Sequence, residues 1–272
     1  MENAKKVEDI LTEELENMLE FLNIKDNYST LIVGLGNKES TPDSLGPLTV
    51  NDVITTNHLY ELNLVSDGFR KTYTLSPGVK SNSGIETKDY IKAIANEINP
   101  DFIIVIDSLA SKSIERLNKT IQISSTGISP GSGVGNNRME ISHDTLGIPV
   151  IAIGVPTVVD AATIVSNTIM FLYKYYAYNR LDNIKKINKL ALQKSNYLNK
   201  NINLNIKEKT LLFGMIGMLK EEETYELINE VLNPIGYNLM VTTKEIDFLI
   251  NKLSNTISNS INKTLHNVNL LK

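Results

Sequence analysis

The stretch that decides the fold is Leu31–Pro47, LIVGLGNKESTPDSLGP. It opens with a short apolar run that is typical of a buried strand. Gly34 and Gly36 follow, and residues without a Cβ allow the backbone to turn and to approach a neighbour closely. A polar loop then leads to Asp43, and Gly46 with Pro47 opens a helical pattern. This order places the Asp43 carboxylate just beyond the end of a strand, where open α/β sheets hold their functional groups.

A second apolar run, Phe102–Ile106, repeats this design and is followed directly by Asp107. Its lack of polar positions indicates a strand that is covered on both faces. If the two strands lie parallel and close together in one sheet, Asp43 and Asp107 share a crevice. The alternative is that each aspartate only caps the helix or turn that follows it.

Strand-like and helix-like segments alternate as far as residue 177. We expect strands at 31–33, 69–75, 102–106, 120–125 and 149–155, and helices at 5–22, 46–57, 87–98, 111–117, 158–177, 221–232 and 243–266. The alternation predicts an α/β fold. More specifically, we expect a three-layer α/β/α sandwich around a largely parallel or mixed sheet, with helical additions at the C-terminus.

The chain is predicted to form a single domain, residues 1–272. Within it we expect an N-terminal helix in 1–25 and a catalytic core in 30–178. Residues 180–209 are rich in Lys and Asn and weakly patterned, which indicates a variable excursion. Residues 210–272 form a C-terminal helical part.

Composition excludes several classes of function. The formal net charge of -4 argues against a general nucleic-acid binder, which usually presents a basic face. The absence of cysteine excludes disulfides, thiolate metal sites and a Cys nucleophile. The N-terminus lacks the pattern of a secretory signal, and no apolar run approaches the ~20 residues of a membrane span. We therefore expect neither nucleic acid nor a membrane among the partners.

Two carboxylates in one crevice have a specific chemistry. They repel each other, so one proton is held between them. One can then activate a water molecule while the other protonates a leaving group. The pair could also hold a hard cation, but the three histidines, His58, His143 and His266, show no ligand spacing. We expect no metal and no other cofactor.

A nucleotide site is also considered and rejected. Gly34-x-Gly36 resembles the start of a dinucleotide fingerprint, but Glu39 stands where the third glycine belongs. An acidic loop would also repel a pyrophosphate.

Other polar residues at predicted loop ends are candidates for binding substrate or supporting the pair. Glu86 and Asp160 are two such candidates. The alternative for each is that it only caps a helix. The glycine-dense loop 126–137 (TGISPGSGVGNN) could cradle an anion with its backbone N–H groups or simply be an ordered loop beside the site. The full set of candidates is Asn37, Glu86, Ser129, Gly131, Ser132, Gly133 and Asp160.

Long segments of the chain resemble the germination protease (spore protease) family. The matching runs are LIVGLGNKESTPDSLGPLTV, LSPGV, SGIETKD, PDFIIVIDSLASKSIERLNKTIQIS, TGISPGSGVGNN, TLGIPVIAIGVPTVVDAATI, GMIGMLKEEE and NPIGYNLMVTTKEID. They follow the family's order from about residue 30 to 266, and the resemblance is weakest over 180–209.

This resemblance implies an atypical aspartic endopeptidase with a fold similar to the hydrogenase-maturation peptidases. The implied substrates are small acid-soluble spore proteins, degraded during germination in the cytoplasm of the forespore or spore core. The family's members are typically tetrameric, which implies a homo-oligomer here. Its two proposed catalytic aspartates fall at Asp43 and Asp107.

Two departures from the family pattern bear on this expectation. Members of this zymogen family usually begin with a longer region that includes a propeptide, whereas the recognisable part of this chain starts almost at once. The chain is either a short form without zymogen control or a truncated piece. Ser129 stands where the family usually has His. Two alternatives therefore stay open: a metal-assisted maturation peptidase, and a catalytically silent sporulation paralogue that acts as a binding protein.

Overall fold

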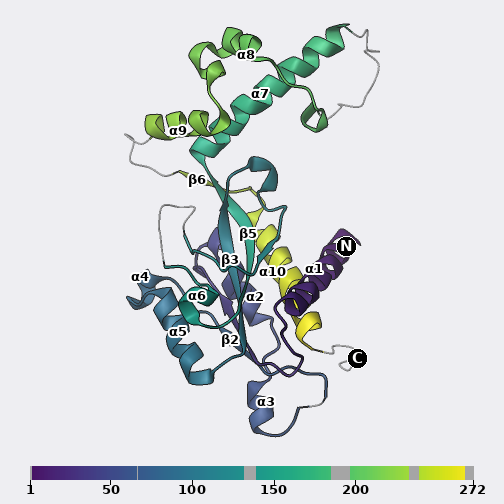
Figure 1. Ribbon diagram of the computed structural model, residues 1–272, viewed down its shortest axis with the longest axis vertical. Helices are drawn as coiled ribbons and strands as arrows, with labels where there is room; N and C mark the ends of the chain where they lie inside the picture. Colours follow the sequence, from purple (N-terminus) through teal and green to yellow (C-terminus); the bar gives the residue numbers. More distant parts are fainter. Residues whose placement is uncertain (1, 66, 132–138, 185–196, 233–238, 267–272) are drawn as a thin grey trace. The chain divides into compact units, whose positions relative to one another are not determined.

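The computed structural model describes residues 2–65, 67–131, 139–184, 197–232 and 239–266 (Figure 1). Contacts between Cα atoms divide the chain into two compact units. The first comprises 1–111, 116–158 and 242–272, and the second comprises 112–115 and 159–241. The first unit contains most of the sheet and the second is mainly helical.

The described strands form one mixed sheet of six strands in the order β2-β1-β3-β5-β4, with β6 also paired to β5. β1 runs parallel to β2 and β3, whereas β4 and β6 run antiparallel to β5. The strands are β1 (Thr30–Gly34), β2 (Thr72–Leu75), β3 (Phe102–Ser111), β4 (Gln122–Ser124), β5 (Val150–Asp160) and β6 (Met240–Val241). The predicted α/β class is confirmed.

Helices account for most of the remaining described residues. The α-helices are α1 (Glu2–Phe21), α2 (Leu45–Asn51), α3 (Asn57–Glu61), α4 (Lys80–Ser83), α5 (Thr87–Ile98), α6 (His143–Leu146), α7 (Ala161–Ile184), α8 (Ile206–Phe213), α9 (Glu221–Leu232) and α10 (Ile246–Leu265). Short 3-10 helices are η1 (Thr41–Asp43), η2 (Ile114–Arg116), η4 (Tyr197–Asn199) and η5 (Gly214–Met218). None of the helices in the described part of the chain is both long and apolar enough to cross a lipid bilayer.

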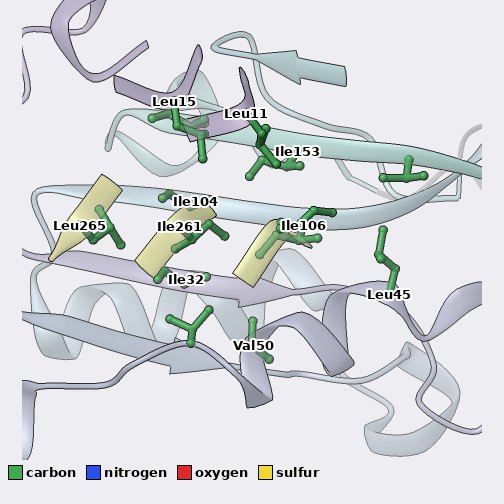
Figure 2. Close-up of a cluster of buried hydrophobic side chains, with 14 of the residues drawn as sticks. Leu11, Leu15, Ile32, Leu45, Val50, Ile104, Ile106, Ile153, Ile261 and Leu265 are labelled. Atoms are coloured by element: carbon green, nitrogen blue, oxygen red, sulfur yellow. The ribbon is translucent and has the colours of Figure 1, made fainter. Parts of the chain in front are cut away.

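The sheet of the first unit is covered by helices on both faces. Successive side chains of a strand point to opposite sides, so each central strand contributes to both buried layers. Ile104 and Ile106 of β3 belong to a buried cluster with Leu15 of α1, Val50 of α2 and Ile261 of α10 (Figure 2). The intervening residues of β3 face the other way.

On that second face, Ile103 and Val105 pack with Ile91 of α5 and Leu146 of α6. Figure 1 shows α5 and α6 on the opposite side of the strands from α1 and α10. The architecture is therefore the three-layer α/β/α sandwich that the alternation of segments predicts.

Several predicted boundaries are correct and two predicted helices are wrong. In place of the helix expected at 111–117, β3 continues to Ser111 and only the 3-10 helix η2 follows. The helices at 87–98 and 221–232 are confirmed as α5 and α9. The predicted helix 46–57 instead ends at Asn51, and α3 follows it after a break. The break is set by contacts far along the chain: the Ile54 N–H donates to Asn262 Oδ1, and the Thr56 hydroxyl donates to the carbonyl of Arg70.

The central strands extend further than their apolar runs. β3 continues to Ser111, so Asp107 lies within the strand rather than after it. The extension packs on β5, where Leu109 occupies the space that a Cβ on Gly154 would need. α7 likewise runs to Ile184, into the predicted excursion 180–209, which also contains η4 and the start of α8.

Candidate active site

Asp43 stands at the end of η1, in the connection between β1 and α2. The Asn37 backbone N–H donates to Asp43 Oδ2 at 2.8 Å. Gly36 makes this approach possible, because its φ is 113° and a Cβ there would lie 2.0 Å from the Asp43 carbonyl oxygen. The sequence-based inference that this glycine serves a turn and a close approach is confirmed.

A second close approach fixes the start of α2 against the ends of β1 and β3. A Cβ on Gly46 would lie 2.3 Å from the carbonyl oxygen of Leu35 and 2.7 Å from that of Ile106. A Cβ on Gly34 would in turn lie 2.2 Å from the carbonyl oxygen of Gly46. The chain three residues after Asp43 is therefore in backbone contact with the residue that precedes Asp107.

Asp107 lies in β3 with 4% of its surface exposed. The Ser108 backbone N–H donates to its Oδ1 at 2.9 Å. β1 and β3 are parallel, with Gly34 opposite Ile106, and the Leu35 N–H donates to the Ile106 carbonyl at 2.8 Å. The carboxyl end of β1 thus lies beside Ile106, the residue before Asp107 in β3.

The segments that carry the two aspartates lie close together, since Cα atoms of η1 and β3 approach within 8 Å. Asp107 is buried and Asp43 is half-buried. A pair of carboxyl groups that shares one proton can activate water and protonate a leaving group. That Asp43 and Asp107 act as such a pair stays a prediction.

Glu86 follows β2, which is also parallel to β1, so the loop that leads to it leaves from this same edge. It occupies the residue before α5, where its backbone carbonyl accepts the Tyr90 N–H. Its carboxylate forms an ion pair with Lys80 at 2.9 Å and is 15% exposed. Glu86 therefore occupies the N-cap position of α5, but its side chain makes no capping hydrogen bond there. Its contribution to substrate binding stays a prediction.

Asp160 belongs to the second unit and has a helix-capping role. Its Oδ1 accepts the Thr163 N–H and its Oδ2 accepts the Thr163 hydroxyl, both at 2.7 Å, at the start of α7. Burial, and secondarily the charge of Asp160, raises the pKa of Tyr225 in the same unit. Through these two hydrogen bonds Asp160 stabilises the start of α7.

The glycine-dense loop is described only in part. Ile128 pairs with Ile141 in a β-bridge and packs in the cluster beneath α5, which places the half-buried Ser129 next to an anchored residue. Gly131 has a φ of 71°. Ser132 and Gly133 lie outside the described residues, and the predicted contact of this loop with substrate remains a prediction.

One cavity on this unit lies away from the two aspartates. A groove of 1340 Å³ is lined by α1, the end of α10 and the segment before β2, including Glu8, Arg70, Lys263 and His266. Neither Asp43 nor Asp107 lines it. Within the described residues, no group of three or more His, Asp and Glu side chains is placed to hold a metal ion.

The close approach of Gly46 to Leu35 and Ile106 is not among the sequence-based predictions, which give Gly46 only as the start of a helix and place the close approach at Gly34 and Gly36. Its signal was present, because a Gly-Pro pair three residues after Asp43 marks the start of a helix that must begin close to another backbone.

A family profile described as germination protease matches residues 1–270. The chain belongs to the germination protease family. The germination protease of Geobacillus sp. (strain WCH70) is 47% identical over 272 residues, covering 97% of this chain and 73% of that protein. The germination protease of Bacillus subtilis (strain 168) is 45% identical over 271 residues, covering 97% and 74%.

Among solved structures, the NiFe hydrogenase maturation protease HycI from Thermococcus kodakarensis KOD1 matches 53% of this chain and 80% of its own, with 17% identity and a TM-score of 0.32. The predicted membership of the germination protease family is confirmed by the family profile and by these two curated relatives. Membership makes the chain a protease, and its chemistry and substrate are proposed below.

Proposed function

We propose that the chain is an endopeptidase in which Asp43 and Asp107 form the catalytic pair. The observation that supports this most directly is the packing of Gly46 on the backbone of Leu35 and Ile106. It joins the loop that carries Asp43 to the strand that carries Asp107, and no side chain intervenes. Two residues 64 positions apart in the sequence are thus attached to one rigid junction.

The chemistry follows from two carboxyl groups that share one proton. The ionised carboxylate accepts a proton from water as the water oxygen bonds to the peptide carbonyl carbon. The protonated carboxyl then donates its proton to the amide nitrogen as the C–N bond breaks. The products are an acid and an amine, and the pair again holds one proton.

The proposed substrates are small acid-soluble spore proteins, cleaved during germination in the spore core by a homotetramer. Family membership supports a role in spores, and the resemblance of the matched segments supports the substrate class. The partly described loop 126–137 flanks the substrate in this proposal, with Ser129 where the family usually has His.

The proposal is tested with Asp43→Asn and Asp107→Asn, which keep the side-chain size and remove the acid–base function. Each variant should lose roughly 10²–10⁴-fold in the rate of cleavage of a small acid-soluble spore protein. Fragments are identified by mass spectrometry, and circular dichroism verifies the fold. Asp144→Asn, on the exposed surface of α6, is the matched control and should cleave at the parent rate.

Two outcomes would contradict the proposal. Cleavage at the parent rate by either Asn variant would remove that aspartate from the mechanism. Cleavage that stops in EDTA and returns with added Mn²⁺ or Zn²⁺ would replace a metal-free pair with a metal-assisted peptidase.

A further inference from the structure

The connection between β1 and α2 contains a compact turn centred on Asn37. The side-chain Oδ1 of Asn37 accepts the Glu39 backbone N–H at 3.0 Å. Its backbone carbonyl accepts the Ser40 N–H at 3.1 Å. Its own backbone N–H donates to Asp43 Oδ2 at 2.8 Å. Every hydrogen-bonding group of the Asn37 main chain, together with its side-chain oxygen, is therefore used inside the loop that carries Asp43.

The side-chain bond of Asn37 has a structural consequence for the peptide that precedes it. An asparagine that accepts the N–H two residues ahead closes a turn and restricts its own backbone angles. The peptide N–H of Asn37 lies within this restricted segment, between Gly36 at φ 113° and the turn. Its direction toward Asp43 is thus set by the side chain of the same residue.

We propose that Asn37 is the positioning residue of Asp43, because its side chain holds the turn that directs its backbone N–H at the Asp43 carboxylate. This inference rests on the proposed function, in which Asp43 takes part in the reaction. The bond from Asn37 is charge-assisted when Asp43 is ionised, so it is stronger in that state. It also restricts rotation of the carboxyl group, which keeps the reacting oxygen in one place.

The pH dependence of kcat in the test below is affected by the charged residues on the elements around η1. Among the described elements, β3, α2 and α10 pack against η1. β3 contributes Asp107 and α2 contributes no charged residue. α10 carries Asp247, Lys252 and Lys263, and Lys263 is paired with Glu8 and Asp9 of α1. The turn itself adds Lys38 and Glu39, both exposed.

Three variants of the full chain test the proposal by cleavage of a small acid-soluble spore protein. Asn37→Ala removes the acceptor for the Glu39 N–H and should lower kcat by about 10- to 100-fold with little change in KM. Its acid limb, the pH at which kcat falls by half, should move to higher pH, because the ionised carboxylate loses a held donor. Asn37→Ser offers a shorter acceptor for the same N–H and should recover part of both changes.

Lys38→Ala is the matched control, since it alters an exposed neighbour and leaves these hydrogen bonds in place. It should keep the parent kcat and acid limb. An acid limb that stays at the parent pH in Asn37→Ala would overturn the proposal. This holds even if kcat falls, because a variant that is partly unfolded also loses activity. Equal loss of activity in the Ala and Ser variants would also overturn it.

The failure of this inference differs from failure of the proposed function. If Asp43→Asn is inactive and Asn37→Ala behaves as the parent, only the positioning role is wrong. If Asp43→Asn is active, the catalytic pair itself is wrong.

Discussion

Gly46 is the residue on which the geometry of the candidate site depends most closely. Each atom that a Cβ there would approach is a backbone atom: Leu35 O at 2.3 Å, Leu35 N at 2.5 Å and Ile106 O at 2.7 Å. Backbone atoms in the centre of a sheet cannot rotate aside as a flexible side chain can. Gly46→Ala should therefore force β1 and α2 apart and destabilise the fold by about 1–3 kcal/mol or more.

Gly84→Ala is the control for that measurement. Gly84 has a φ of 73° and no heavy atom within 4 Å of its Cβ position, so alanine there meets only the left-handed backbone cost of about 1 kcal/mol. Urea unfolding of the two variants separates a close contact from a backbone preference. Equal losses of stability would show that the contact with Leu35 and Ile106 can relax.

At this scale the sequence predicted the candidate pair and part of its support. Asp107 is identifiable because it directly follows an apolar run, Asp43 because it lies in the polar loop after another such run, and Gly36 because it precedes that loop. The role of Asp160 was ambiguous in the sequence, since a carboxylate before a helix can serve catalysis or capping. Its two hydrogen bonds to Thr163 show that it caps α7, and they depend on a side-chain orientation that sequence spacing does not specify. A contribution of Asp160 to substrate binding stays a prediction.

Among the elements, α1 has apolar residues that differ strongly in burial. Leu15 is 2% exposed and packs in the cluster with α10 and the sheet, whereas Ile10 is 50% exposed. Leu15→Ala should lose about 2–5 kcal/mol of unfolding free energy, because it leaves a cavity in a packed layer. Ile10→Ala, on the same helix, should change it by no more than about 0.5 kcal/mol.

Chemical denaturation of the two α1 variants checks this difference. A small loss for Leu15→Ala would mean that α1 contributes little to the stability of the first unit. A large loss for Ile10→Ala would mean that its exposed side is covered in solution.

The elements also show where local pattern fails as a predictor. The helix α5 is predicted to the residue, because its apolar spacing and its stop at Asn99-Pro100 are both local signals. The helix predicted at 46–57 fails because residues 54–56 are bound by Asn262 and Arg70, which lie far away in the sequence. Such long-range hydrogen bonds override helix propensity and leave no mark in the segment itself.

For the molecule as a whole, the three layers and the mixed sheet follow from the alternation of segments. The alternation does not show how segments that are distant in the sequence join at the other edge of the sheet. Arg70 is 5% exposed and donates from Nη1 to the carbonyls of Lys25 and Tyr28. His266, at the end of α10, lies against the Arg70 backbone and the residues around Ile54. In the sequence His266 is only one of three histidines without ligand spacing, and its structural role arises entirely from tertiary contacts.

His266 makes the stability of the first unit dependent on pH. It is 3% exposed, its Nδ1 lies 3.3 Å from the Arg70 backbone N–H, and its Nε2 lies 3.2 Å from the Ile54 carbonyl oxygen. Burial lowers the pKa of His266; the hydrogen bond to Ile54 opposes this, and the charge of Arg70 adds to it. The imidazole is therefore neutral in the fold, with Nδ1 accepting from Arg70 and Nε2 donating to Ile54.

The sign of the pH dependence follows from the lowered pKa. In the unfolded chain His266 takes up a proton near its ordinary pKa of about 6.5, whereas in the folded chain it does so only at lower pH. Stability from this residue is therefore fully present above pH ~6.5 and falls as pH decreases below it, by at most about 1.4 kcal/mol per pH unit. Urea unfolding at a series of pH values from 7.5 to 5.5 measures this slope.

His266→Gln separates the contribution of this group from those of all the others. A glutamine amide can accept and donate hydrogen bonds but does not titrate, so the variant should lose part of the parent's stability at pH 7.5 and show a shallower decline toward pH 5.5. His58→Gln, at an exposed position on α3, should leave the parent slope unchanged. A parent and a His266→Gln variant with equal slopes would mean that the imidazole can be protonated in place, and the contacts with Arg70 and Ile54 would then have to open without unfolding the chain.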